Sequence, residues 1–278
     1  MRITIQAQAK INWALDILSR REDGYHEMDM LMQKIALSDE IRFETARWTT
    51  LTVNGHLIAN AGKNLIVRAA NLLNEYMGEK RGVRITLVKR IPVRAGLGGG
   101  SADCAAALMA LNDLWGFKLP TKTLKKLALS LGADVPYCME NDFCRVRGIG
   151  EDVQRLENAP RVPLVVVCVN PGLSTQAVFT NFDEAGDSPL LVPMERLYAC
   201  LTSGDFRTAE ALSGNALERA AIRLLPAVAD TMQKMRECGA LYTRMSGSGS
   251  AVFGVFETME RAKAVAQQME GAIATETI

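Results

Sequence analysis

The sequence lacks the features that mark metal-binding, membrane and nucleic-acid-binding proteins. It has 278 residues but only two histidines, and its six cysteines include no C-x-x-C pair, so the paired ligands of a zinc site are missing. No apolar run reaches the roughly 18 residues that a membrane span needs. Lys and Arg number 32 against 31 Asp and Glu, so neither a nucleic acid nor a membrane surface is expected as a partner.

The cysteines lie mostly in apolar stretches such as VVVCVN, which is typical of buried thiols in a reducing compartment. The first residues alternate polar and apolar side chains, whereas a signal peptide has a continuous apolar core. We therefore expect a cytoplasmic protein with unpaired cysteines.

Strand-like and helix-like patterns alternate along the chain and predict an α+β fold. Strands are expected at 1–18, 40–46, 49–55, 82–92, 163–171, 241–245 and 251–256. Helices are expected at 64–78, 101–114, 121–131, 194–202, 205–213, 215–225, 227–238 and from 258. The apolar face of the first helix is expected to comprise Leu65, Ala69, Leu72, Leu73 and Tyr76. Residues 151–163 are expected to form a linker between two domains, 1–155 and 156–278.

The segment IPVRAGLGGGSADCAAALMALN, residues 91–112, places four glycines between a strand and an alanine-rich helix. The N–H groups and the dipole at a helix start suit a phosphate, and Ser101 is expected to cap the helix. A tight structural bend is the alternative, which four glycines in five positions make less favoured. Neither the Walker pattern nor the dinucleotide fingerprint fits, because no Lys follows the glycines and Ser101 replaces the last fingerprint glycine.

Three segments together resemble the motifs of the GHMP kinase superfamily: AQAKINWALDI, the glycine segment itself, and TRMSGSGSAVFGVF. REDGYHEMD, LGADVPYC and GNALE are similar to its branch that acts on a cytidine-diphosphate-bearing methylerythritol. The resemblance implies a ribosomal-protein-S5-like N-terminal domain and a ferredoxin-like C-terminal domain. It also implies ATP as cosubstrate, with Mg²⁺ carried by the nucleotide instead of a dedicated protein site. A monomer or a homodimer is expected.

The resemblance assigns the catalytic roles to Lys10 and Asp134. Taken alone, Asp134 is an ordinary turn residue beside Gly and Pro, and Lys10 is a lysine that snorkels from a strand edge. In the family the two form a pair, in which Asp134 accepts the proton of the substrate hydroxyl and Lys10 stabilises the developing charge. The implied ATP-binding residues are Asn64 for the adenine and Pro92, Val93, Arg94, Ala95, Gly96, Leu97, Gly98, Gly99, Gly100, Ser101 and Ala102 for the phosphates.

The acceptor pocket is implied around Tyr25 and His26, which follow an Asp-Gly turn. An aromatic ring stacks on a base and an imidazole hydrogen-bonds its edge, although a buried tyrosine beside a surface histidine is an equal alternative from the residues alone. Phe179 is expected on the opposite face of the base, and Asn12 near the methylerythritol. The third-motif loop, Ser246, Gly247, Ser248 and Gly249, is expected to help hold the phosphates; a flexible hairpin is its alternative.

The chain departs from the family pattern at three places, all of which bear on acceptor specificity. Glu140, Asn141 and Asp142 replace a glycine pair and are expected to reshape a loop, Trp13 replaces a small aliphatic residue, and Ser250 replaces a proline. The leading hypothesis is phosphorylation of hydroxyl 2 of the methylerythritol, in the non-mevalonate route to isoprenoids. The alternatives are a homoserine- or mevalonate-type kinase and a non-catalytic sensor of nucleotide and sugar.

Overall fold

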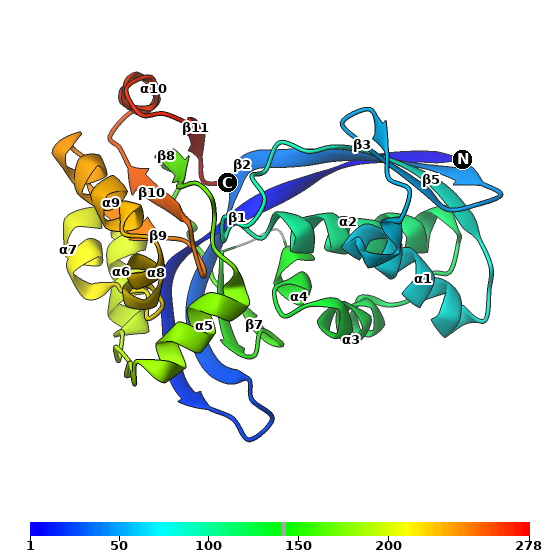
Figure 1. The fold of residues 1–278 in the computed structure, drawn as a ribbon, viewed down its shortest axis with the longest axis horizontal. Helices are drawn as coiled ribbons and strands as arrows, with labels where there is room; N and C mark the ends of the chain where they lie inside the picture. The colour runs from blue at the N-terminus through cyan, green and yellow to red at the C-terminus, as the bar shows by residue number, and fades with distance from the viewer. Residues whose placement is uncertain (141–142) are drawn as a thin grey trace. The chain divides into compact units, whose positions relative to one another are not determined.

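The computed structural model describes residues 1–140 and 143–278 and contains two compact units (Figure 1). The first unit comprises Met1–Ala9, Leu37–Ile91 and Gly98–Asn141, and the second comprises Lys10–Ala36, Pro92–Leu97 and Asp142–Ile278. The two long strands β1 (Arg2–Arg20) and β2 (His26–Ala46) each contribute residues to both units. The domain boundary at 155/156 stays a prediction, and the predicted loop change at Asn141 and Asp142 lies outside the described residues.

The first unit combines part of a mixed sheet with helices, which Figure 1 shows gathered on one side of β2, β3 and β5. Its further elements are β3 (Thr50–Val53), β4 (His56–Leu57), the 3₁₀ helix η1 (Ala61–Lys63), α1 (Leu65–Met77), β5 (Gly82–Val88), α2 (Gly99–Leu114), α3 (Thr121–Leu131) and α4 (Val135–Cys138). Strand β5 pairs antiparallel with β2 and parallel with β3. The strand predicted at 82–92 ends earlier in the structure, at Val88.

Local sequence signals account for several of these boundaries. Asn54 and Gly55 have φ of 47° and 83°, as an Asn-Gly hairpin turn between β3 and β4 requires. Asn64 caps α1 by accepting the N–H of Ile66, a role that was not predicted, and Gly78 ends the helix in the left-handed region at the predicted boundary.

The predicted apolar face of α1 is right at Ala69 and Leu73, which are buried, but wrong at the other three positions, because Tyr76 is 54% exposed and Leu65 and Leu72 are only half-buried. The buried stripe is Ile66, Val67, Ala69, Ala70 and Leu73. Helix α1 packs against α2, and its two alanines on the buried side allow a close approach of the two helices.

The second unit contains an antiparallel sheet in the order β11-β8-β10-β9. With helices between β8 and β9 and between β10 and β11, this is the ferredoxin-like order, in agreement with the expected C-terminal domain. Helix α9 packs on β9 and β10, and α10 packs on β8 and β11. The elements are β6 (Cys144–Gly148), β7 (Asp152–Arg155), β8 (Pro163–Cys168), α5 (Thr175–Glu184), α6 (Met194–Ser203), α7 (Phe206–Leu212), α8 (Glu218–Leu224), α9 (Ala227–Glu237), β9 (Tyr242–Met245), β10 (Ala251–Val255), α10 (Met259–Ala266) and β11 (Ala272–Glu276).

The predicted linker at 151–163 is partly wrong, because its first half forms β7. This short strand pairs antiparallel with β6, which in turn pairs with Met28–Met32 of β2. A four-residue strand with three charged or amide side chains shows no strand periodicity, so the pattern resembled a linker.

The cysteines of the described residues are free, and their burial is uneven. Cys104, Cys138 and Cys144 are buried, whereas Cys168, Cys200 and Cys238 are half-buried, so the expectation of buried thiols holds for the first three. Burial raises the pKa of Cys104 to about 12 and that of Cys168 to about 11, which keeps both thiols protonated at neutral pH. No helix in the described part of the chain combines the length and the apolar character that crossing a bilayer requires.

Trp13 is a core residue of the second unit. Its ring lies 5.1 Å from that of Tyr242 and 5.7 Å from that of Phe253, both in edge-to-face geometry, and 6.2 Å from that of Phe206. The indole N–H donates to Gln33 Oε1 at 2.9 Å, so its one polar group is satisfied. The departure from the family pattern at position 13 thus fills the core.

Replacing this indole should be costly. We expect Trp13→Ala to lower the free energy of unfolding by about 3–5 kcal/mol, the usual cost of deleting a large buried aromatic ring. The matched control is Trp48→Ala, because Trp48 is 70% exposed. Urea unfolding followed by circular dichroism measures both, and equal midpoints would contradict the core role.

Candidate active site

Lys10 is held inside the second unit by its neighbour on β1. Its side chain is only 3% exposed, and its Nζ donates to Asn12 Oδ1 at 2.6 Å. Residues two apart on a strand face the same side, which brings the ammonium and the amide together. The same Oδ1 accepts the N–H of Gly247 at 3.0 Å, and the backbone N–H of Lys10 donates to Leu97 O at 3.0 Å. The burial excludes the snorkelling alternative.

The third-motif loop connects β9 and β10, and it is buried throughout residues 246–250. Ser246 Oγ donates to Gly96 O at 3.0 Å, and the Oγ atoms of Ser248 and Thr175 lie 2.9 Å apart. A Cβ on Gly96, whose φ is 75°, would lie 2.1 Å from Ser246 O. Burial and close packing contradict the flexible-hairpin alternative, and they explain why position 96 requires glycine.

Helix α2 begins directly after the glycine loop, but Ser101 does not cap it. The N-cap is Gly98, with φ of 67° and no side-chain hydrogen bond, and Ser101 is the third helical residue. The prediction failed because Gly98, in the left-handed conformation, takes the N-cap position, so the helix starts at Gly99, two residues before Ser101. The first turn therefore carries the backbone N–H groups of Gly99, Gly100 and Ser101, the arrangement that suits a phosphate.

A buried group of charges below this helix start was not found by sequence reasoning. Lys89 Nζ donates to Asp103 Oδ2 at 2.7 Å and also contacts Asp39 Oδ2. Asp39 Oδ1 accepts the backbone N–H groups of Arg90 at 2.5 Å and Ile91 at 2.8 Å. These bonds tie the chain that leaves β5 to β2 and to the first turns of α2. One signal was available, since a charged Asp103 in an alanine-rich helix requires a partner.

The charges in this group do not balance, because two carboxylates share one ammonium. Burial raises the pKa of Asp103 to about 7, with Asp39 adding to the rise and Lys89 opposing it. Asp103 Oδ1 is buried and has no hydrogen-bond partner among the described residues. The neutral carboxyl is therefore favoured in the folded protein over much of the acidic range.

Asp134 and Asn64 lie in the first unit. Asp134 is half-buried at the N-cap position of the single-turn helix α4, without a side-chain capping bond. The amide oxygen of Asn64 accepts the N–H of Ile66 at 2.9 Å. Lys10 lies in the second unit, so the pairing of Lys10 with Asp134 and the adenine contact of Asn64 stay predictions.

The predicted acceptor residues give an aromatic cluster in the second unit. His26, the first residue of β2, is buried, and its ring lies 5.0 Å from that of Phe179 on α5 at an angle of 32°. His26 Nε2 lies 2.7 Å from Asp183 Oδ1, which fixes the ring orientation. Tyr25 is 59% exposed. The structure therefore contradicts the alternative of a buried tyrosine and a surface histidine, because the histidine is buried and the tyrosine is exposed.

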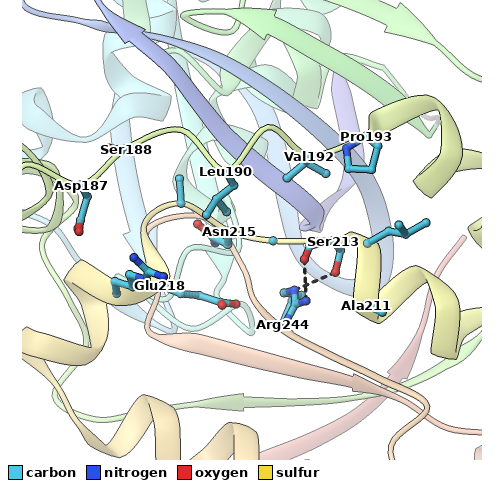
Figure 2. Close-up of a pocket in the computed structure, with 14 residues that line it drawn as sticks. Asp187, Ser188, Leu190, Val192, Pro193, Ala211, Ser213, Asn215, Glu218 and Arg244 are labelled. Carbon is cyan, nitrogen blue, oxygen red and sulfur yellow. Dashed lines mark hydrogen bonds between the residues drawn. The ribbon is translucent and has the colours of Figure 1, made fainter.

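A separate cavity of about 330 Å³ also lies in the second unit, and Figure 2 shows Asn215, Glu218 and Arg244 in its wall. Arg244 donates to Ser213 Oγ at 2.9 Å and to Ser213 O at 2.8 Å. Of the residues predicted for catalysis, ATP or acceptor, none lines this cavity in the part of the chain that the structure describes.

Comparison with known proteins defines the class. Residues 64–141 match the model of the GHMP kinases N terminal domain, and residues 197–274 match that of the GHMP kinases C terminal domain. The chain belongs to the GHMP kinase family, and its α+β, two-domain fold is confirmed as that of the family. A homoserine kinase from Cytophaga hutchinsonii shares the fold, with a TM-score of 0.70 at 22% identity over 100% of this chain and 94% of the other.

Closer relatives carry one name, 4-diphosphocytidyl-2-C-methyl-D-erythritol kinase. The protein of that name from Pelotomaculum thermopropionicum is 42% identical over 96% of this chain and 93% of its own length. The one from Rhizobium etli is 40% identical over 97% and 91%. A crystal structure of 4-(cytidine 5'-diphospho)-2C-methyl-D-erythritol kinase has a TM-score of 0.85 at 36% identity, over 99% of both chains.

The raised pKa of Asp103 predicts a pH dependence of stability. The unfolded carboxyl loses its proton near its ordinary pKa of 3.8, whereas the folded one keeps it to about pH 7. Stability should therefore fall as the pH rises from about 4 to about 7, since each unit of pKa difference is worth about 1.4 kcal/mol. We expect Asp103→Asn to flatten this decline in thermal unfolding midpoints. Asp113→Asn, an exposed position on the same helix, should leave the decline unchanged. Parallel curves for the wild type and Asp103→Asn would contradict the assignment.

Proposed function

We propose that this protein is an ATP-dependent kinase that phosphorylates hydroxyl 2 of the methylerythritol part of 4-diphosphocytidyl-2-C-methyl-D-erythritol, in the non-mevalonate route to isoprenoid precursors. The observation that carries the proposal is the His26–Phe179 cluster beside the Gly-Tyr-His turn. Homoserine and mevalonate have no base to stack, so this cluster favours a cytidine-bearing acceptor over theirs. The names of the relatives that match nearly the whole chain support the same choice.

The proposed chemistry assigns complementary roles to two charged residues. Asp134 accepts the proton of the acceptor hydroxyl, and Lys10 stabilises the negative charge that develops on its oxygen. Asn12 supports Lys10, because its Oδ1 accepts from Nζ at 2.6 Å and fixes the ammonium without neutralising it. A buried, positioned lysine favours a catalyst over a non-catalytic sensor.

The proposed nucleotide site uses backbone more than side chains. The first-turn N–H groups of α2 are proposed to bind phosphate oxygens, and the glycine loop from Pro92 to Ala102 surrounds these oxygens. The third-motif loop, which belongs to the second unit, is proposed to help hold the phosphates. Asn64 is proposed to contact the adenine. Mg²⁺ is proposed to enter with the nucleotide, where it would offset phosphate charge.

The proposed acceptor site holds the cytosine between Tyr25 and Phe179, with His26 at its edge. Asp183 orients the His26 imidazole through the 2.7 Å contact at Nε2. Asn12 is proposed to lie near the methylerythritol. Residues 1–155 and 156–278 are proposed as the two domains, in a protein that acts as a monomer or a homodimer.

The phosphate role of the glycine loop is testable at Gly100, where the structure has room for a side chain. An added Cβ would meet only Leu65 Cδ1, at an ordinary 3.6 Å, and Gly100 does not need a positive φ. We expect Gly100→Ala to keep its thermal midpoint but to bind ATP about tenfold more weakly by calorimetry, because the methyl group takes space beside the phosphate-binding N–H groups. Gly96→Ala should instead lower the midpoint, since its Cβ collides with Ser246 O. Unchanged ATP affinity in Gly100→Ala would contradict the phosphate role.

The acceptor is tested by a panel of alcohols and by competition. We expect ATP consumption with 4-diphosphocytidyl-2-C-methyl-D-erythritol and none with homoserine or mevalonate. CMP should compete with the acceptor, and Phe179→Ala should raise the acceptor KM through the loss of about 1–3 kcal/mol of stacking, while the KM for ATP stays unchanged. Asp134→Asn is the inactive control, with kcat expected to fall by about 10²–10⁴. If CMP does not bind the wild type, the cytidine assignment is wrong.

A further inference from the structure

The segment Gly214–Glu218, GNALE in the sequence, has no role in the function proposed above. It connects α7 to α8 and forms part of the cavity wall in Figure 2. Asn215 is only 4% exposed although it lies in that wall, so its amide is directed into the protein. An amide buried in this way must be hydrogen-bonded, and its partners indicate what it holds.

The partners of the Asn215 amide are all backbone groups. Its Nδ2 donates to Met245 O at 3.0 Å and to Gly247 O at 2.8 Å, and its Oδ1 accepts the N–H of Leu217 at 2.9 Å. Glu218 adds a further bond to the same loop, because its Oε1 accepts the N–H of Met245 at 3.0 Å. Two side chains of one segment therefore fix the first residues of the third-motif loop.

The segment is itself fixed to β1, the strand that carries Lys10. The N–H of Leu15 donates to Gly214 O at 2.9 Å, and the N–H of Ala216 donates to Leu15 O at 2.8 Å. Asn215 lies between these two bonded residues. Their partner Leu15 is five residues from Lys10 along β1. The backbone of the segment is thus bonded to β1, while the Asn215 side chain between these bonds holds Met245 and Gly247.

The loop passes this constraint on to the Lys10 ammonium. The N–H of Gly247 donates to Asn12 Oδ1 at 3.0 Å, and the same oxygen accepts from Lys10 Nζ at 2.6 Å. The space at this point is filled, because a Cβ on Gly247 would lie 2.9 Å from Gly96 O and 3.1 Å from Lys10 Nζ. A shift of Gly247 would therefore move Asn12, Lys10 or the phosphate loop.

We propose that Asn215 is a positioning residue for phosphoryl transfer, which holds Gly247 so that the Gly247 N–H fixes Asn12 and through it the Lys10 ammonium. The kinetic part of this inference rests on the function proposed above. The chemistry explains the residue type: the two N–H donors of Nδ2 meet two carbonyl oxygens, whereas a carboxylate of the same shape would place an oxygen against both of them.

The experiment compares Asn215→Ala and Asn215→Asp with Asn112→Ala in the full-length protein. Asn112 is a matched control, since it is 6% exposed and bridges backbone groups in the same way, with Nδ2 donating to Leu119 O and Oδ1 accepting the N–H of Leu119. Its bonds brace the connection between α2 and α3. Three quantities are measured for each variant: the thermal midpoint, kcat with the KM of each substrate, and amide hydrogen exchange of peptides that cover residues 245–251.

We expect both Asn215 variants to lose about tenfold or more in kcat, with the acceptor KM changed less than about twofold, because the His26–Phe179 cluster is untouched. Exchange in peptides 245–251 should accelerate in both, since the loop has lost its anchor. Asn112→Ala should lower the midpoint but keep kcat and the exchange of these peptides. Asn215→Ser retains one donor, so its kcat and exchange rates should lie between those of the wild type and Asn215→Ala. This variant replaces the other two in the comparison if either of them does not fold.

A folded Asn215→Ala with wild-type kcat, or with wild-type exchange at 245–251, would overturn the inference and leave Asn215 as a core residue only. The two proposals fail separately. If the wild type does not phosphorylate the cytidine-bearing acceptor, the proposed function is wrong, and the exchange measurement alone still decides whether Asn215 anchors the loop.

Discussion

A lysine ammonium buried in a strand must be surrounded by oxygen acceptors, and the structure around β1 in the second unit follows from this requirement. Asn12 supplies the acceptor from the same face of the strand. Gly247 has to be glycine because the ammonium and the Gly96 carbonyl occupy the space where its Cβ would lie. Gly96 has to be glycine for the corresponding reason, since Ser246 O fills its side. Backbone segments that are far apart in the sequence approach each other here without side chains between them.

Lys10, which is buried, and Lys89, which is half-buried, are held by different chemistry. Asn12 is neutral, so its contact with the Lys10 ammonium is a hydrogen bond and not an ion pair. Asp39 and Asp103 together carry more charge than Lys89, so that ammonium is fully offset when both are ionised. The Lys89 arrangement suits a fixed support, which connects β2, the end of β5 and the start of α2.

Local signals in the sequence were enough to predict much of the fold and part of the candidate site. The end of α1 at Gly78 and the strand–glycine–helix junction each depend on a few residues, and each was found. The buried face of α1 was found only in part, because it depends on the position of α2. The linker prediction failed at β7 because that strand is defined by its pairing with β6. The Asp39–Lys89 contact joins residues 50 apart, and no local pattern shows which distant charge a lysine will meet. The anchoring bonds of Asn215 reach 30 and 32 residues along the chain, and the motif that contains it was visible while its purpose was not.

The passage of β1 and β2 through both compact units has a consequence for how the protein is made. Strand β6 begins at Cys144, yet its partner residues Met28–Met32 are synthesised more than a hundred positions earlier. During translation the backbone groups of this strand edge have no β6 to pair with until residues 144–148 have been synthesised. An unpaired edge of this kind is a site for unwanted pairing between chains. A fragment that ends before β6 would keep this edge exposed, so the N-terminal half alone is not expected to form a well-behaved product. The chain has to be completed before its first strands are fully covered.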